Sequence, residues 1–247
     1  MTSTEKVIQL AVQFIDSAPQ GKRYSELVRE ISAALPNIPV NTIHGALHKF
    51  RTDLPPTVYQ PNKGLYRNVK YRDEHDLQQE KVEKQIKNKK IREEDFYDAF
   101  GEWITNEIEE CTRYISLGGN RFKDKWGTPD VIGVREARRS DIIKPPTEIV
   151  SCEIKLYPAN LITAFGQACS YKLFSHKSYI VVPLSSSEDD IARLDALSRI
   201  FGIGLILFNP LDPKNPNFTI RSRASREEPD MFFVNKYLKL VEDELFT

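Results

Sequence analysis

The first 69 residues place hydrophobic side chains at helical spacing in three short segments. The first predicted helix covers residues 4–17, and a second begins near Ser25. A third is expected after Asn41, a residue type that caps helix N-termini. Two short strands, at residues 58–60 and 65–67, then flank a turn that contains Pro and Gly. This pattern predicts a small domain of three helices followed by a β-hairpin.

Charged residues of both signs dominate the next segment, residues 70–92. Glu80 and Lys84 are four residues apart, which is the spacing of ion pairs along a helix. Apolar positions are too sparse for a good coiled-coil seam. We therefore expect a charged helical linker that leads into a second domain at residues 93–247.

The second domain alternates predicted strands and helices. Its strands are short runs of Val, Ile and Leu, as in a buried sheet, and its helices carry apolar residues three and four positions apart. The predicted strands cover residues 131–134, 149–156, 178–183, 204–208 and 218–220, and the predicted helices cover residues 92–110, 161–176, 185–201 and 231–245. An α/β core is expected.

Composition narrows the function only slightly. Lys and Arg total 35 and Asp and Glu total 35, so any contact with nucleic acid must rely on local basic patches. No apolar run approaches the length of a membrane span, and a soluble, cytoplasmic protein is expected. Cys111, Cys152 and Cys169 show no CxxC spacing, which favours reduced thiols over disulfides or zinc ligands.

Three short motifs in the second domain point to the cleavage of phosphodiester bonds. One ends just before a predicted strand, one lies within the next strand, and one places two polar residues four apart on the following helix. The motifs are Pro129 with Asp130, Glu153-Ile154-Lys155, and Gln167 with Tyr171. In an extended strand Glu153 and Lys155 share a face, so a carboxylate from each of two neighbouring strands can meet beside a lysine.

Hydrolysis of a phosphodiester needs a polarised phosphate, a nucleophilic hydroxide and relief of charge on the leaving oxygen. A hard cation such as Mg²⁺ supplies all three and prefers carboxylate and water ligands. Asp130 and Glu153 are the candidate ligands, and Lys155 would orient or deprotonate the attacking water and offset charge. An isolated ExK triplet is usually a solvated strand face, so the hypothesis depends on the three motifs occurring in order.

With PD, ExK and QxxxY in this order, the region from about residue 93 to about residue 223 resembles the PD-(D/E)xK nuclease superfamily. The resemblance implies a restriction-endonuclease-like mixed sheet flanked by helices, dependence on Mg²⁺ with Mn²⁺ able to substitute, and products with a 5′-phosphate. It also implies that Asp130 and Glu153 bind the metal and that Lys155 is the catalytic lysine. Gln167 and Tyr171 would support the site or contact the substrate backbone.

Many nucleases of this superfamily carry a further acidic residue on the first helix of the domain. Glu93 lies one turn before Phe96, on the core face of the predicted helix, and is the candidate for this third ligand. Glu94, Glu102 and Glu107 compete with it. For each of these residues the alternative is a solvated acid on a helix surface.

The N-terminal pattern of three helices and a hairpin resembles a winged helix-turn-helix domain. In that resemblance the third helix is the recognition helix and the hairpin is the wing, and both carry side chains suited to phosphates and base edges. The candidate DNA-binding residues are Asn41, Thr42, His44, Gly45, His48, Lys49 and Arg51 on the helix, and Lys63 and Arg67 on the wing. The alternative is a winged helix that binds another protein.

These features predict a metal-dependent DNA endonuclease of restriction or defence type with a separate DNA-reading domain. Two alternatives stay open: a repair or recombination nuclease that recognises DNA structure, and a DNA-binding regulator with an inactive nuclease-like domain. The intact Asp130, Glu153 and Lys155 argue against the regulator. One site cuts one strand, so double-strand cleavage would require a homodimer, which we expect to form on DNA.

Overall fold

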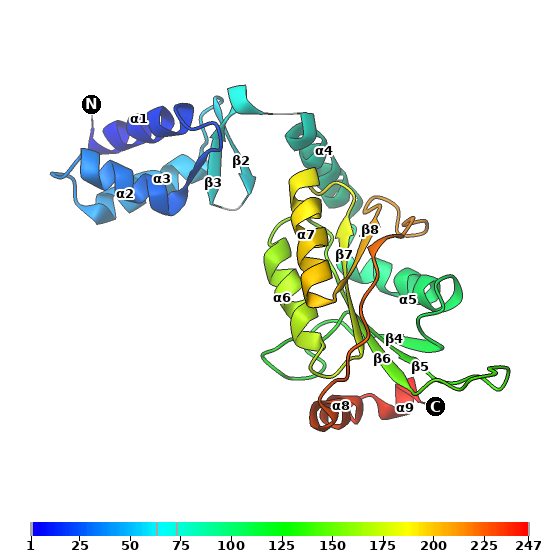
Figure 1. Cartoon of the computed structure of the whole chain (residues 1–247). Helices are drawn as coiled ribbons and strands as arrows, with labels where there is room; N and C mark the ends of the chain where they lie inside the picture. The colour runs from blue at the N-terminus through cyan, green and yellow to red at the C-terminus, as the bar shows by residue number, and fades with distance from the viewer. Residues whose placement is uncertain (1, 63, 73, 247) are drawn as a thin grey trace. The chain divides into compact units, whose positions relative to one another are not determined.

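A computed structural model describes residues 2–62, 64–72 and 74–246 of the chain (Figure 1). The chain divides into two compact units, residues 1–78 and residues 79–247. Each unit has its own hydrophobic core, and each is described separately below.

The N-terminal unit combines helices with a small antiparallel sheet. Strand β3 lies in the middle of the sheet, between β1 and β2. The elements are α1 (Ser3–Asp16), β1 (Lys22–Arg23), α2 (Tyr24–Ala34), α3 (Val40–Thr52), β2 (Val58–Asn62) and β3 (Leu65–Asn68). The apolar faces of the three helices pack with Val58 and Tyr66 into one core. The predicted helices and hairpin are confirmed, whereas the two-residue strand β1 was too short to give a sequence pattern.

The expected cap of α3 is wrong. The helix begins at Val40, and its N-cap is Pro39, so Asn41 and Thr42 lie in the first turn. The amides of Thr42 and Ile43 both donate to the Pro39 carbonyl, at 2.9 and 3.2 Å. Proline is tolerated at a helix start because the first N–H groups of a helix have no acceptor within it.

Helix α4 (Glu74–Lys89), preceded by the short 3₁₀ turn η1 (Val69–Tyr71), occupies most of the predicted linker. The boundary between the two units falls within this helix. Ile86 is buried in the core of the C-terminal unit, and the Lys89 ammonium donates to the Leu211 carbonyl at 3.2 Å. The last turns of α4 are therefore part of the C-terminal unit.

The C-terminal unit contains a six-stranded mixed sheet in the order β4-β5-β6-β7-β8-β9. Its three middle strands, β6 to β8, are parallel, and the remaining pairings are antiparallel. The strands are β4 (Arg113–Ser116), β5 (Val131–Arg135), β6 (Glu148–Ile154), β7 (Lys177–Pro183), β8 (Gly204–Phe208) and β9 (Thr219–Ser222). The fold of this unit is therefore mixed α/β.

Helices cover both faces of this sheet (Figure 1). They are η2 (Glu93–Phe96, a 3₁₀ turn), α5 (Tyr97–Asn106), α6 (Leu161–Tyr171), α7 (Glu188–Phe201), α8 (Met231–Leu238) and α9 (Glu242–Leu245). On one face Phe96 and Phe100 pack against Val150, Cys152 and Ile154, the apolar side predicted for the central strand. On the other face α6 and α7 cover β7 and β8.

Four local predictions needed correction. Strand β6 ends at Ile154, so Lys155 lies one residue beyond it, although its amide still donates to the Val181 carbonyl at 2.9 Å. The predicted helix at 92–110 begins as a 3₁₀ turn, the closing helix breaks after Leu238, and α6 ends at Tyr171. Strand β4 was not predicted.

Within the described residues, the structure contains no helix with the length and apolar character needed to cross a membrane.

Candidate active site

The antiparallel pairing of β5 and β6 brings the first two motifs together. Val131, the first residue of β5, pairs with Cys152, so Asp130 lies at the end of the sheet beside Glu153. The Asp130 amide continues the pairing by donating to the Cys152 carbonyl at 2.9 Å. The register of these two strands therefore sets the two carboxylates next to each other.

Asp130 is buried, and both of its carboxylate oxygens accept hydrogen bonds. The Tyr97 hydroxyl donates to Oδ1 at 2.5 Å, and the Ile154 amide donates to Oδ2 at 2.7 Å. The first bond comes from the start of α5 and the second from the last residue of β6. Asp130 is thus held from both the helical layer and the neighbouring strand.

Glu153 is the more deeply buried carboxylate, with 2% of its surface exposed. The Tyr171 hydroxyl donates to Oε2 at 2.6 Å, and the Lys155 ammonium lies 3.0 Å from Oε1. The same Tyr171 hydroxyl lies 3.1 Å from the Thr128 carbonyl oxygen. Tyr171 therefore connects α6 to Glu153 and to the loop that carries Asp130.

Glu93 is the first-helix acid that reaches this site. Its Oε2 lies 3.4 Å from the Lys155 ammonium, and its Oε1 accepts a hydrogen bond from the Leu156 amide at 3.1 Å. Glu94 lines the rim of the same cavity, whereas Glu102 and Glu107 line a separate hollow beside Trp103. Among the four competing acids, Glu93 is the one that contacts Lys155 in this part of the structure.

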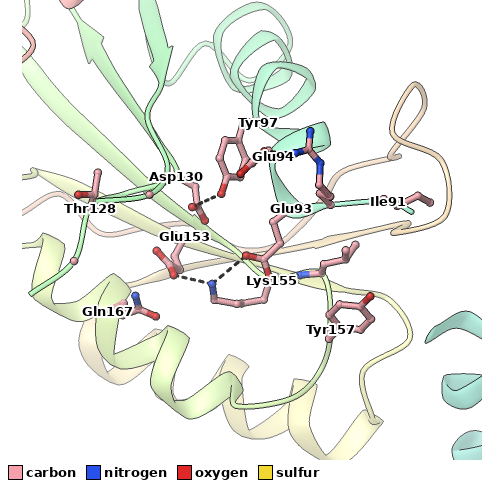
Figure 2. Close-up of a pocket in the computed structure, with 14 residues that line it drawn as sticks. Ile91, Glu93, Glu94, Tyr97, Thr128, Asp130, Glu153, Lys155, Tyr157 and Gln167 are labelled. Atoms are coloured by element: carbon pink, nitrogen blue, oxygen red, sulfur yellow. Dashed lines mark hydrogen bonds and ion pairs between the residues drawn. The ribbon is translucent and has the colours of Figure 1, made fainter. Parts of the chain in front are cut away.

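These side chains converge on one cavity of about 560 Å³ (Figure 2). The lining groups come from η2 and α5, from the loop before β5, from the end of β6 and from α6. They include Glu93, Tyr97, Thr128, Asp130, Glu153, Lys155 and Gln167. All five motif residues from Asp130 to Tyr171 therefore lie in or directly behind this cavity.

Gln167 and Gly127 form one wall of the cavity. The side chain of Gln167 is half-buried, one turn before Tyr171 on the same face of α6. Gly127 has a φ of +95°, and a Cβ at this position would approach the Tyr171 hydroxyl to 3.3 Å and Gln167 Nε2 to 3.6 Å. Glycine is therefore favoured where the loop passes α6.

Burial and like charge shape the electrostatics of the site. Burial raises the pKa of Asp130, and the charge of Glu153 raises it further, against the opposing hydrogen bonds from Tyr97 and Ile154. Burial likewise raises the pKa of Glu153, although Lys155 and Tyr171 oppose this shift. Burial tends to lower the pKa of Lys155, but the charges of Glu153 and Glu93 outweigh it and raise the pKa. Lys155 therefore keeps its proton at neutral pH.

Among the described residues, no three or more His, Cys, Asp or Glu side chains are placed together as a ready metal-binding group. The carboxylate oxygens of Asp130, Glu153 and Glu93 are turned instead toward Tyr97, Tyr171, Lys155 and backbone amides. The donor set still suits a hard cation, because buried carboxylates outnumber the one lysine among them. These residues fit a divalent cation in chemistry, and binding would require exchange of some of these hydrogen bonds.

The DNA-binding candidates of the N-terminal unit lie on α3 and β3. Asn41, His44, Gly45, His48, Lys49 and Arg51 are exposed on α3, and Thr42 is half-buried. His44 stacks on Tyr24 and shares a hydrogen bond with its hydroxyl at 2.9 Å. The Arg67 guanidinium donates to the Pro19 carbonyl at 2.7 Å and so holds the loop after α1. Lys63 lies outside the described residues.

Tyr97 is the site residue that sequence reasoning missed. A tyrosine on a helix has no motif that marks it as a partner for a distant aspartate, and Tyr97 is 33 residues from Asp130. Its position one turn after Glu93 was the only available signal.

No protein-family model matches the chain, and no curated protein has significant sequence similarity to it.

Proposed function

We propose that this chain is a metal-dependent DNA endonuclease whose catalytic unit is residues 79–247. The observation that carries the proposal is the pairing of buried Asp130 with buried Glu153 at one end of the sheet, with Lys155 3.0 Å from Glu153. Such an arrangement destabilises the protein on its own, because each buried charge loses hydration and the two acids repel. Costs of this kind are typical of functional sites.

Asp130 and Glu153 would hold the cation, with Glu93 as the third carboxylate. The cation, when bound, would supply Lewis-acid activation and relieve negative charge on the phosphodiester. Lys155 lies beside Glu153 and Glu93, so it would donate a hydrogen bond to the water or phosphate and offset developing charge. In hydrolysis water adds to phosphorus, the bond to the leaving 3′ oxygen breaks, and that oxygen takes up a proton.

Tyr97 and Tyr171 position the two carboxylates. Each hydroxyl donates one short hydrogen bond, to Asp130 and to Glu153 respectively. Burial raises the pKa of both phenols, and the adjacent carboxylates raise it further, so both remain donors at neutral pH. Partners of this kind fix the orientation of metal-binding groups and are important for affinity.

The N-terminal unit is proposed as a winged helix that binds duplex DNA. The exposed face of α3 carries His48, Lys49 and Arg51. His48 and Arg51 also line a hollow with Gln60 of β2. A cationic helix beside a hairpin suits contact with phosphates and base edges. This reading supports a division between DNA binding in residues 1–78 and cleavage in residues 79–247.

The direct test is incubation of the full chain with plasmid, linear duplex and single-stranded DNA, in Mg²⁺, in Mn²⁺ and in chelator. The proposal expects internal cleavage that requires the cation and leaves 5′-phosphate ends. Complete absence of cleavage of every substrate in both cations would overturn it and favour the DNA-binding regulator.

A further inference from the structure

The loop that delivers Asp130 to the site also presents a tryptophan to solvent. Trp126 is 61% exposed and directly precedes Gly127 and Thr128, which line the cavity. The chain has two tryptophans, and the other, Trp103, is half-buried against Phe100 and Phe218. A large aromatic group left in water beside a candidate active site is a binding feature to be explained.

The loop is held firmly by an aromatic anchor. The ring of Phe122 is buried, 5.1 Å from the ring of Tyr237 and 5.7 Å from that of Phe174, measured between centroids. The Phe122 amide donates to Thr128 Oγ1 at 3.0 Å, which closes the loop on itself. The segment that carries Trp126 is therefore fixed at both ends.

Polar contacts anchor the segment around Trp126 as well. Asp124 accepts hydrogen bonds from the Tyr237 hydroxyl at 2.7 Å and from the Trp126 amide at 3.1 Å. The Ser170 hydroxyl oxygen, on α6, lies 3.3 Å from the Trp126 carbonyl oxygen, while its hydrogen bond to the Gln167 carbonyl is shorter, at 2.7 Å. The exposure of the indole thus results from a structured loop, which presents the ring at little further cost in conformational entropy.

Two cations flank the anchors and face solvent. Lys123 and Lys125 are exposed. Phe122, just before them, is buried, and Asp124, between them, is half-buried. Neither lysine forms an ion pair with another residue in the described part of the chain. Lys123 adopts a left-handed backbone conformation, φ +50°, that glycine or asparagine would adopt more easily. The loop accordingly presents an indole and two cations together.

We propose that residues 123–126 bind an unpaired nucleotide of DNA beside the cleavage site, with the base stacked on Trp126 and the phosphates contacted by Lys123 and Lys125. This inference rests on the proposed function for the identity of the substrate. An aromatic platform with adjacent cations is the combination that binds single strands. Bases inside an intact duplex are covered by their neighbours, so the partner is a single strand or a locally opened duplex.

Binding is measured with the full chain in chelator, so that cleavage does not interfere. Tryptophan fluorescence of the wild type is followed as a single-stranded oligonucleotide, a duplex with an internal bubble or a blunt duplex is added. The affinities of the wild type and of every variant are measured by the fluorescence anisotropy of dye-labelled DNA, a readout that does not depend on Trp126. We expect quenching by the strand and the bubble, and little quenching by the blunt duplex. Trp126→Ala should weaken binding of the single strand by about tenfold, because the base loses its stacking partner. Trp126→Phe should retain most of the affinity.

The control for the aromatic group is Phe201→Ala, at the exposed end of α7 that leads into β8, away from Glu153. The control for charge is Lys144→Gln, in the loop between β5 and β6, against Lys123→Gln and Lys125→Gln. Equal affinity of Trp126→Ala and Phe201→Ala for the single strand would overturn the inference. If the two affinities are equal but cation-dependent cleavage is retained, the proposed nuclease function stands. If binding depends on Trp126 but no DNA is cleaved, the nuclease proposal is refuted instead.

Discussion

The hydroxyl of Tyr171 donates a 2.6 Å hydrogen bond to Oε2 of Glu153, the most buried carboxylate of the site. The two residues are 18 positions apart, on α6 and on β6. This bond joins the helix motif to the strand motif. One helical turn separates Gln167, which lines the cavity, from Tyr171, which reaches Glu153 from the same side of α6.

Removal of this hydroxyl is the first prediction. Tyr171→Phe leaves the ring in place but deprives Glu153 of a donor, and cleavage or Mg²⁺ affinity should fall about 10- to 100-fold. The matched control is Tyr66→Phe in the N-terminal unit, whose buried hydroxyl has no partner among the described residues. Cleavage rates and metal titrations of both variants check this, and an unaffected Tyr171→Phe would show that the bond is dispensable.

The second prediction concerns stability and pH without metal. Asp130 has a folded-state pKa above its ordinary value, so between these two pH values the folded state binds more protons than the unfolded state. The free energy of unfolding therefore falls as pH rises through the raised pKa. Asp130→Asn removes this cost. In chelator at pH 8 the variant should melt above the wild type, by about 2–4 °C for each kcal/mol relieved.

The same comparison has two internal checks. The difference in melting temperature should shrink toward pH 4, where the wild-type carboxyl is protonated. Added Mg²⁺ should raise the melting temperature of the wild type and much less that of Asp130→Asn, because a cation bound only to the folded state stabilises it. A variant that melts below the wild type at pH 8 in chelator would contradict the cost assigned to the buried pair.

The third prediction concerns the N-terminal unit. The isolated fragment 1–78 has its own core and should fold and bind duplex DNA weakly, with affinity that falls as salt rises. Arg51→Gln and Lys49→Gln should each weaken this binding and reduce the salt dependence. Lys6→Gln, exposed on α1, is the control and should have little effect. If the fragment folds but does not bind duplex DNA at low salt, a protein-binding role for this unit is favoured.

The fourth prediction concerns the number of copies needed to cut a duplex. The chain holds one set of the proposed catalytic motifs, so concerted cleavage of both strands should need two copies. The rate of double-strand cleavage should rise faster than linearly with protein concentration, and mixing with excess Glu153→Gln should yield nicked plasmid. Concerted double-strand cuts by a species that remains monomeric during turnover would refute this.

The adjacency of Asp130 and Glu153 could be anticipated from the sequence, because two apolar runs predicted neighbouring strands and each carried an acid near the same end. The alternation of side chains along the strand also predicted that Val150, Cys152 and Ile154 form the core side of β6. Local patterns of this kind reflect burial, which the sequence encodes directly.

Other contacts depend on tertiary placement and left no local pattern. Tyr97 meets Asp130 only because α5 packs on the sheet, and Glu93 reaches Lys155 from a 3₁₀ turn that a helix prediction does not distinguish. The anchoring of Trp126 depends on Tyr237, more than a hundred residues away. The start of α3 at Val40 was missed because Asn41 looked like a better cap than Pro39.

The most direct test of the account is cleavage of DNA in Mg²⁺ by Glu153→Gln beside the wild type. The substitution keeps the size of the side chain and removes its charge, and Glu102→Gln, exposed on α5 away from the cavity, is the matched control. Far-ultraviolet circular dichroism and melting curves establish that all three proteins are folded. The account predicts cleavage by the wild type and by Glu102→Gln, and at least a hundredfold loss, on the order of 3 kcal/mol in the barrier, for folded Glu153→Gln. Cleavage by Glu153→Gln at the wild-type rate would contradict it.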